Sequence, residues 1–95
     1  MSYELRDNKE ANRFEVEVEG HIAFVDYRRG KDHISYIHTE VPKELSGNGV
    51  GSFLAKKVLE YAEQHQLRVK PYCPFIKAYI DKHPEYQSIS EFHKA

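Results

Sequence analysis

Three alternate glycines, Gly47, Gly49 and Gly51, stand where an apolar strand pattern ends and an apolar helical pattern begins. Glycine adopts positive φ easily and lets another group approach the backbone where a Cβ would collide. A helix that begins here leaves its first N–H groups unpaired and carries a partial positive charge at that end. These properties predict a binding site for a phosphate group. The glycines could instead serve only a tight turn and close helix packing, and the sequence leaves both interpretations open.

Two well-known phosphate loops do not fit this turn. A Walker loop requires Lys-Ser or Lys-Thr after its last glycine, and neither follows Gly51. The run Gly-Asn-Gly-Val-Gly is too short for the dinucleotide-binding fingerprint, and the strands before it are predicted to form hairpins rather than a βαβ unit.

The single cysteine, Cys73, is a second candidate for chemistry. It ends a predicted strand and directly precedes Pro74, which suits the first position of a helix. A thiol ahead of a helix N-terminus is in an environment that favours the thiolate, which is the reactive form. A lone cysteine can equally be an inert buried residue. Because it is the only cysteine, an internal disulfide is excluded.

No metal site is expected. The histidines fall in different predicted elements without the spacing of metal ligands, and only one cysteine is available. The histidines are His21, His33, His38, His65, His83 and His93.

Length and charge limit the possible function classes. A chain of 95 residues suffices for one small core, so we expect one domain over residues 1–95. With 14 basic and 15 acidic residues, the net charge of −1 would not attract nucleic acid or an anionic membrane.

No apolar run approaches the roughly 20 residues that span a bilayer. A polar N-terminus and the single thiol favour a cytoplasmic protein.

The elements that must position these residues follow from the hydrophobic pattern. Residues 2–12 have little periodicity and are predicted to form an irregular lead-in. Strict alternation over residues 13–19 predicts a half-buried strand. Two further strands are predicted over residues 21–29, buried on both faces, and 33–39. Tight turns join the three strands, so we expect an antiparallel meander.

A helix of about four turns is predicted to begin at Val50, because apolar residues recur at helical spacing after it. Residues 67–73 are predicted to return as a strand parallel to the third one. A second helix is predicted over residues 75–82, and residues 85–95 are predicted to be a loosely packed tail. The residues of the second helix expected to face inward are Phe75, Ile76, Tyr79 and Ile80.

The predicted fold class is α+β: an antiparallel β-meander followed by α-β-α, in a mixed sheet with one parallel strand pairing. The run from Ser46 to Gly51 resembles the motif Gln/Arg-x-x-Gly-x-Gly/Ala of the GNAT acyltransferases, with Gly49 and Gly51 at the fixed positions. The segments His-Thr-Glu-Val-Pro before the turn, and Cys-Pro-Phe and His-Pro-Glu-Tyr after it, look like the small stand-alone branch of that superfamily. The resemblance covers residues 13–86.

The resemblance implies an N-acetyltransferase that binds acetyl-coenzyme A. The pyrophosphate would rest on backbone N–H groups of the glycine turn, and the pantetheine arm would run between strands 33–39 and 67–73. The cofactor-binding residues are expected to be Ser46, Gly47, Asn48, Gly49, Val50, Gly51 and Ser52. Ser46 departs from the motif, because serine carries no guanidinium and reaches less far than Gln or Arg. We therefore expect weaker cofactor binding, or a substitute cation from a nearby lysine.

Acetyl transfer to an amine needs a base for the ammonium group and an acid for the departing thiolate. Glu40, at the end of the third strand, is the candidate base. The resemblance places Tyr79 where related proteins carry the tyrosine that protonates the coenzyme A sulfur. Cys73 could take the acetyl group covalently or form a disulfide with coenzyme A. His38 could hydrogen-bond to Cys73 or to the substrate amine.

Each of these four side chains also has a purely structural interpretation. Glu40 could be a solvated carboxylate and Tyr79 a core aromatic ring. Cys73 could be a buried thiol and His38 a histidine within the sheet. The leading hypothesis is acetyl transfer from acetyl-coenzyme A to an amine of a small molecule or peptide. The alternatives are a coenzyme A-binding or protein-interaction module without turnover, and a scaffold with no coenzyme site.

Overall fold

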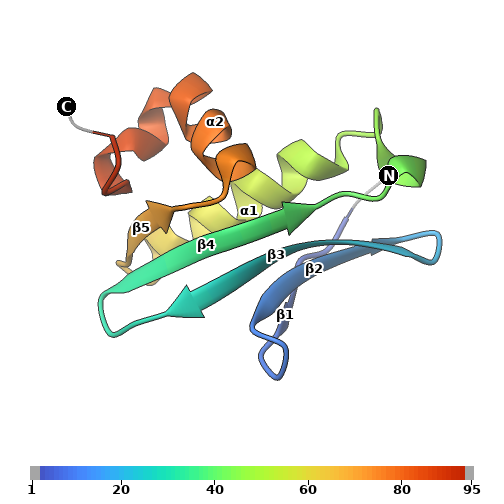
Figure 1. Ribbon diagram of the computed structural model, residues 1–95, viewed down its shortest axis with the longest axis horizontal. Coiled ribbons are helices and arrows are strands. Elements are labelled where there is room, and N and C mark those ends of the chain that lie inside the picture. The colour runs from blue at the N-terminus through green and yellow to red at the C-terminus, as the bar shows by residue number, and fades with distance from the viewer. Residues whose placement is uncertain (1–2, 94–95) are drawn as a thin grey trace.

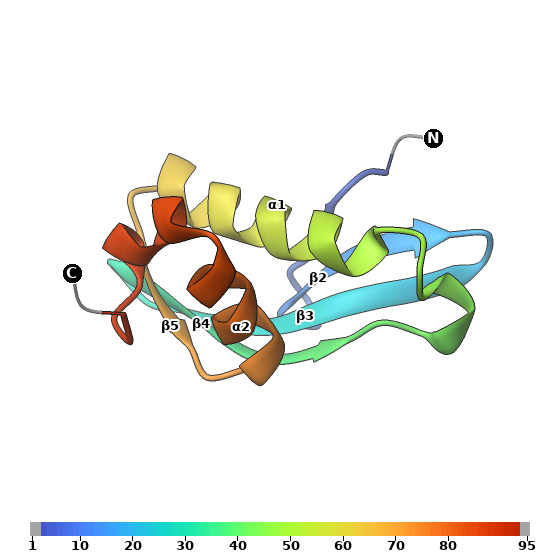
Figure 2. The same cartoon turned by 90° about the horizontal axis from the view of Figure 1, so that it is seen from above.

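The computed structural model describes residues 3–93. Five strands form one mixed sheet in the order β1-β2-β3-β4-β5, and α1 lies along one side of it (Figures 1 and 2). The strands are β1 (Arg6–Asn8), β2 (Arg13–Val18), β3 (His21–Arg29), β4 (His33–Glu40) and β5 (Arg68–Pro71). The helices are α1 (Val50–Gln64), α2 (Pro74–Lys82) and the 3₁₀ helices η1 (Lys43–Leu45) and η2 (Pro84–Ile89). The strands β1 to β4 pair antiparallel and β5 joins β4 in parallel, so the predicted fold class is confirmed.

The core lies between the sheet and the two α-helices. Apolar side chains that alternate along the strands point to α1 and α2, and every fourth or third residue of α1 points back. The fully buried residues with the largest side chains are Tyr36, Phe14, Ile34, Leu54, Leu59, Ile76, Ile80, Val16, Val25, Val50, Val58 and Val69. This packing fixes where α1 begins relative to the end of β4.

The prediction that the second strand is buried on both faces is wrong. In β3 the side chains of Ala23 and Val25 are fully buried, whereas Ile22, on the other face, is 39% exposed. Phe24 is only partly covered, and the guanidinium of Arg13 lies 3.7 Å from the centre of its ring. The apolar run therefore does not mark a central strand between two layers, because helices cover only one face of the sheet.

The N-terminal segment contains an edge strand where an irregular lead-in was predicted; Ser2 lies outside the described residues. Strand β1 pairs with β2, and Glu15 stands opposite Arg6. Arg6 Nη2 lies 2.6 Å from Glu15 Oε1, and Asn8 Nδ2 donates to Glu15 Oε2 at 3.1 Å. Glu15 is only 6% exposed. Polar contacts hold this strand, so hydrophobic periodicity could not reveal it.

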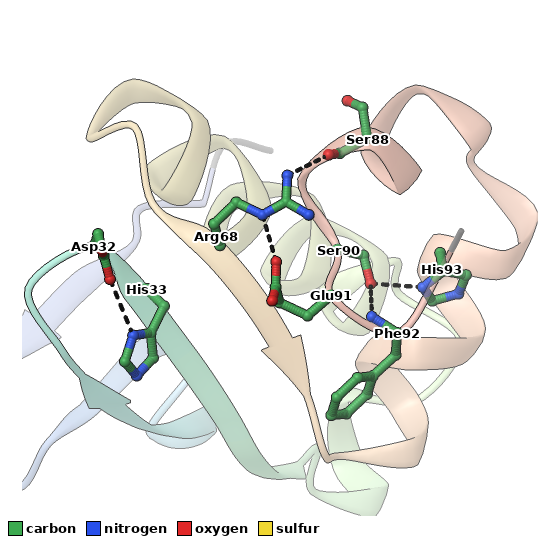
Figure 3. Close-up of polar contacts among 8 residues, drawn as sticks. All are labelled: Asp32, His33, Arg68, Ser88, Ser90, Glu91, Phe92 and His93. Atoms are coloured by element: carbon green, nitrogen blue, oxygen red, sulfur yellow. Dashed lines mark hydrogen bonds and ion pairs between the residues drawn. The ribbon is translucent and has the colours of Figure 1, made fainter. Parts of the chain in front are cut away.

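The C-terminal segment is more closely packed than the predicted loose tail, within the residues described. Ser90 forms an isolated parallel bridge with Val69, and the N–H of Glu91 donates to the Val69 carbonyl at 2.8 Å. Figure 3 shows Arg68 between two tail residues: its Nε donates to Glu91 at 2.5 Å and its Nη1 donates to the Ser88 carbonyl at 2.7 Å. The tail thus pairs with the outer edge of β5.

A histidine joins the same segment to α2. His93 Nδ1 lies 2.6 Å from the hydroxyl of Ser90, and this hydrogen bond is drawn in Figure 3. Its Nε2 lies 2.5 Å from the carboxylate of Asp81 on α2. The hydroxyl of Ser90 also accepts from the N–H of Phe92 at 3.2 Å. Ser90 is 2% exposed, so this network is a structural link between tail and helix.

No helix within residues 3–93 combines the length and the apolar character that a membrane crossing would require.

The pairing of β1 leads to a stability prediction. The hydrogen bond from Arg6 lowers the pKa of the Glu15 carboxyl, and the bond from Asn8 adds to this effect. A carboxylate with a lowered folded-state pKa stabilises the fold at neutral pH, and this contribution is lost as the pH falls through that pKa. We expect Glu15→Gln to lower the free energy of unfolding by about 1 to 2 kcal/mol at about pH 7.

Urea unfolding of both proteins measures this effect, and the difference between them should shrink as the pH falls through the lowered pKa of Glu15. The matched control is Glu17→Gln, because Glu17 is half exposed and lies 3.8 Å from the same Arg6. It should change stability by less than about 0.5 kcal/mol. Equal effects of the two variants would contradict a specific role for Glu15.

Candidate functional site

The glycine turn, residues 46–52, links η1 to α1. Gly47 and Gly49 have φ values of +83° and +75°, a conformation that side-chain-bearing residues rarely adopt. Gly49 is the N-cap residue of α1, and its carbonyl accepts the first helical hydrogen bond from Phe53 at 3.0 Å. The chain thus reverses within a few residues and directs the start of α1 toward the end of β4.

The N–H groups at the start of α1 lack acceptors. Within residues 3–93, the N–H groups of Gly49, Val50, Gly51 and Ser52 donate to no carbonyl or side chain, and no side chain caps the helix. Asn48 differs, because its N–H donates to the Leu45 carbonyl at 3.3 Å. The N–H groups of Gly49, Val50, Gly51 and Ser52 are therefore available to an anion. Helix termini with such unpaired donors bind anions readily.

A hollow of about 410 Å³ lies over the glycine turn. Its lining residues are Val41, Leu45, Ser46, Gly47, Gly49, Val50, Gly51, Ser52 and Phe75. The hydroxyl of Ser46 donates to the Lys43 carbonyl at 2.8 Å, so this side chain stabilises the 3₁₀ turn and brings no charge to the hollow. The four residues whose N–H groups are free, Gly49 to Ser52, all line this hollow.

Tyr3 supports the turn from outside, a contact that no pattern in the sequence indicates. Its hydroxyl donates to the Asn48 carbonyl at 2.9 Å, and its ring packs edge-on against Phe53 at 5.4 Å between centroids. The N-terminal segment therefore holds the glycine turn in place.

Gly51 has a different role from the other two glycines. A Cβ built on Gly51 would lie 3.0 Å from the tip of the Phe75 ring, so the absence of a side chain lets this ring cover the first turn of α1. Conformation accounts for Gly47 and Gly49, and packing accounts for Gly51. The glycines alone therefore do not require a ligand, and the argument for one rests on the free N–H groups.

Strands β4 and β5 part before β4 ends. Pairing extends only to Tyr36 of β4 and Pro71 of β5, and proline has no N–H with which to continue a ladder. On the β3 side of β4, Tyr36 faces Tyr27 and His38 faces Asp26, so Ile37 is an extra residue in a β-bulge. We call the opening between the end of β4 and the chain after Pro71 the fork.

Cys73 lies in the fork. Its N–H donates to the Tyr36 carbonyl at 2.9 Å, and its Sγ lies 3.0 Å from the hydroxyl of Thr39. The thiol is 3% exposed. Thr39 and not His38 contacts Cys73, because the bulge at Ile37 shifts the side-chain alternation by one residue. The other predicted partner of His38, the substrate amine, stays a prediction. No pattern in the sequence marks the bulge, so Thr39 was missed.

His38 and Glu40 lie on the opposite face of β4 from Thr39. They are cross-strand neighbours of Asp26 and Phe24, whose side chains point away from the helices. His38 Nε2 lies 3.7 Å from Glu40 Oε2, and both side chains are more than half exposed. The structure brings these two predicted residues together with each other, on the open face of the sheet, and not with the thiol of Cys73.

Tyr79 belongs neither to the Cys73–Thr39 pair nor to the His38–Glu40 pair. Its ring stacks on His83 with 3.8 Å between centroids and an interplanar angle of 12°. Partial burial, together with the carboxylates of Glu85 and Glu60, raises the pKa of its phenol. Phe75, one turn earlier, is 41% exposed, so the prediction that it faces the core is wrong. Its ring lies over Gly51 instead.

Comparisons with known proteins agree with this geometry. A family model described as GCN5-related N-acetyl-transferase matches residues 13–89. Protein NATD1 of Xenopus tropicalis is 31% identical over 55 residues, which are 58% of this chain and 50% of that protein. Protein NATD1 of Homo sapiens is 33% identical over 55 residues, which are 58% of this chain and 49% of that protein. The chain spans about half the length of the curated relatives it matches.

A solved structure matches the whole fold. A GCN5-like protein from Staphylococcus aureus, studied by NMR in solution, is similar with a TM-score of 0.71 and 30% sequence identity. The match covers 97% of this chain and 96% of that chain. The resemblance noted in the glycine motif therefore extends to the complete arrangement of strands and helices.

The different roles of the glycines can be tested by stability. We expect Gly49→Ala to lower the free energy of unfolding by about 1 to 2 kcal/mol, because alanine disfavours positive φ. Gly51→Ala should change it by less than about 0.5 kcal/mol, because the helix preference of alanine offsets displacement of the exposed Phe75 ring. Urea unfolding measures both. A larger loss for Gly51→Ala than for Gly49→Ala would contradict the assignment.

Proposed function

The chain belongs to the family of GCN5-related N-acetyl-transferases, and we propose that it binds acetyl-coenzyme A at the glycine turn and transfers the acetyl group to an amine of a small molecule or peptide. The observation that carries the proposal is the set of four free N–H groups over Gly49–Ser52, which open onto a hollow. A pyrophosphate supplies acceptors for these donors, and the partial positive charge of α1 favours an anion there. Ser46 brings no cation, so the affinity depends on the main chain.

Acetyl-coenzyme A supplies an activated acyl group as a thioester. The hollow and the fork both border the end of β4, since Val41 lines the hollow and Thr39 contacts Cys73. In this proposal the pantetheine arm passes from the hollow to the fork, where β4 has no partner on its β5 side. The open main chain there gives the arm hydrogen-bonding groups that β5 would otherwise use.

Cys73 is the nucleophile in this proposal. Its Sγ bonds to the acetyl carbon, the bond from that carbon to the coenzyme sulfur breaks, and the thiol proton passes to the departing sulfur. The acceptor amine then takes the acetyl group from Cys73 and a proton returns to Sγ. The hydroxyl of Thr39, 3.0 Å from Sγ, accepts from the thiol and can donate to the thiolate.

His38 and Glu40 act on the acceptor. An alkyl amine is protonated at neutral pH and must lose a proton before it attacks a carbonyl group. The imidazole and the carboxylate stand 3.7 Å apart on the open face of β4, where an amine can approach from solvent. Glu40 attracts the ammonium group, and the imidazole of His38 takes its proton.

A second candidate function is a coenzyme A-binding module without turnover. The 3% exposure of Cys73 favours it, because a buried thiol meets an acyl donor only if the fork opens. Calorimetry with acetyl-coenzyme A, together with a thiol-release assay over a panel of amines, distinguishes the two functions. Binding with thiol release supports the transferase, whereas binding without release supports the module.

The contribution of the main chain can be tested at Ser52. We expect Ser52→Pro to weaken acetyl-coenzyme A binding about tenfold or more, because it removes one N–H that would bond to a charged phosphate. Proline is tolerated in the first turn of a helix, and the preceding Gly51 has no Cβ to clash with it. Ser52→Ala keeps the N–H and should bind within about twofold of the wild type. Equal Kd values for all three proteins, by calorimetry, would refute the amide site.

The role of the thiol is tested by mass spectrometry of the intact protein after incubation with acetyl-coenzyme A. We expect the wild type to gain the mass of one acetyl group, and Cys73→Ser to gain none while its Kd for acetyl-coenzyme A is unchanged. Thr39→Val should slow the gain about tenfold, because it removes the only side-chain hydrogen bond of the thiol within residues 3–93. Normal turnover by Cys73→Ala would show direct transfer and contradict a covalent role.

A further inference from the structure

One short segment of the tail contacts both of the elements that flank Cys73. Strand β5 ends at Pro71, shortly before this cysteine, and α2 begins at Pro74, directly after it. Residues 90–93, which we call the strap, pair with β5 and also bond to α2. Figure 3 shows the side chains of the strap beside β5. The chain that carries the thiol is therefore held on both sides by the strap.

On the β5 side, the strap pairs with the main chain and packs against an aromatic ring. Ser90 forms a parallel bridge with Val69, and the N–H of Glu91 donates to the Val69 carbonyl at 2.8 Å. The ring of Phe92 packs edge-on against Tyr72, with 5.1 Å between the ring centroids. Tyr72 is 57% exposed and Phe92 is 41% exposed. This ring contact lies at the surface, so it can break without disturbing the core.

On the α2 side, a histidine holds the strap. The side chain of His93 is 9% exposed. Its ring nitrogens lie 2.6 Å from the Ser90 hydroxyl and 2.5 Å from the carboxylate of Asp81. A neutral ring with its proton on Nε2 donates to the carboxylate and accepts from the hydroxyl, so both hydrogen bonds form without a net charge on the ring. The strap is thus fastened to the last part of α2.

The thiol of Cys73 becomes accessible only when this region moves. Cys73 is 3% exposed, and its Sγ lies 3.0 Å from the Thr39 hydroxyl. Widening of the fork moves Tyr72, Cys73 and the start of α2 away from β4. The strap resists this movement, because it joins Tyr72 and α2 to β5, which stays paired with β4. A helix moves as one body, so a bond at Asp81 also restrains the first turn of α2.

We propose that the strap is a gate for Cys73. While residues 90–93 are docked, the fork stays closed and the thiol is shielded. When they detach, the fork widens and a thiol-reactive molecule reaches Sγ. The gate controls acetyl transfer through Cys73 only if the proposed function holds, whereas the shielding of the thiol depends on the fold alone.

The rate at which dithiobis-nitrobenzoate reacts with the folded protein tests the gate. The thiolate of Cys73 attacks this aromatic disulfide, a mixed disulfide forms and one coloured thiolate leaves, so the absorbance reports the single thiol of the chain. We expect Phe92→Ala to react about fivefold faster than the wild type, because it loses the contact with Tyr72. Phe92→Tyr keeps the ring and should react at the wild-type rate.

His93→Ala should also react about fivefold faster, because it loses the hydrogen bonds to Ser90 and Asp81. The matched control is His21→Ala, which removes a histidine 3.9 Å from a carboxylate of Glu44. His21 begins β3 at the β2–β3 hairpin, and this hairpin lies at the opposite end of the molecule from the strap (Figure 1). This control should react at the wild-type rate.

Glu15→Gln distinguishes opening of the strap from unfolding of the whole protein. It weakens the contacts of β1, which is at the opposite edge of the sheet from β5. Because opening of the strap does not involve β1, this variant should react within about twofold of the wild type. If the thiol reacted only after global unfolding, Glu15→Gln would be accelerated in proportion to its lost stability.

Circular dichroism checks that each variant is folded, and Phe92→Ala, at an exposed position, gives the decisive comparison if His93→Ala does not fold. Reaction of Phe92→Ala at the wild-type rate, or equal acceleration of Glu15→Gln, would overturn the gate. The disulfide reaction needs no coenzyme. Faster reaction of the strap variants, with no gain of an acetyl group by any of the proteins from acetyl-coenzyme A, would therefore support the gate and overturn acetyl transfer through Cys73.

Discussion

The end of the pairing between β4 and β5 determines the positions of the candidate groups. Because Pro71 cannot continue the ladder, the last residues of β4 have no parallel neighbour and the chain turns away into α2. The hydrogen bond from the Cys73 N–H to the Tyr36 carbonyl still joins the two segments, and it fixes the thiol at the opening. A longer β5 would pair with the end of β4 and close the fork. The same residues would then form an ordinary sheet edge with no space beside Cys73.

The bulge at Ile37 adds a second constraint to the same strand. An extra residue in one strand exchanges the faces to which all later side chains point. In β4 it sends Thr39 toward the helices and Cys73, and His38 and Glu40 toward the open face. Strict alternation from Ile34 would have placed His38 beside the thiol. A single inserted residue therefore determines which side chains at the end of β4 face Cys73 and which face solvent.

The accuracy of the sequence predictions depends on how far each element relies on apolar periodicity. Helix α1 and the meander were predicted well, because their buried residues repeat at regular intervals over many positions. Strand β1 was missed, because contacts of Arg6 and Asn8 with Glu15 hold it instead of an apolar face. The bulge was missed as well, since a register shift depends on pairing between strands distant in sequence. The turn at Gly49 was located correctly, but its free N–H groups are a property of the folded helix end.

The separation of groups across β4 bears on how acetyl transfer would proceed. Direct transfer requires the amine and the thioester to meet at one point, with the base within reach of the amine. Here the His38–Glu40 pair lies on the open face, and the Thr39–Cys73 pair lies on the helix face with a thiol that is 3% exposed. An acetyl group held on Cys73 would be shielded from water, and the donor and acceptor would not need to occupy the fork together. The amine must still attack the acetyl carbon on Cys73, so a covalent relay works across the two faces of β4 only where the fork lets the amine reach Sγ from the open face.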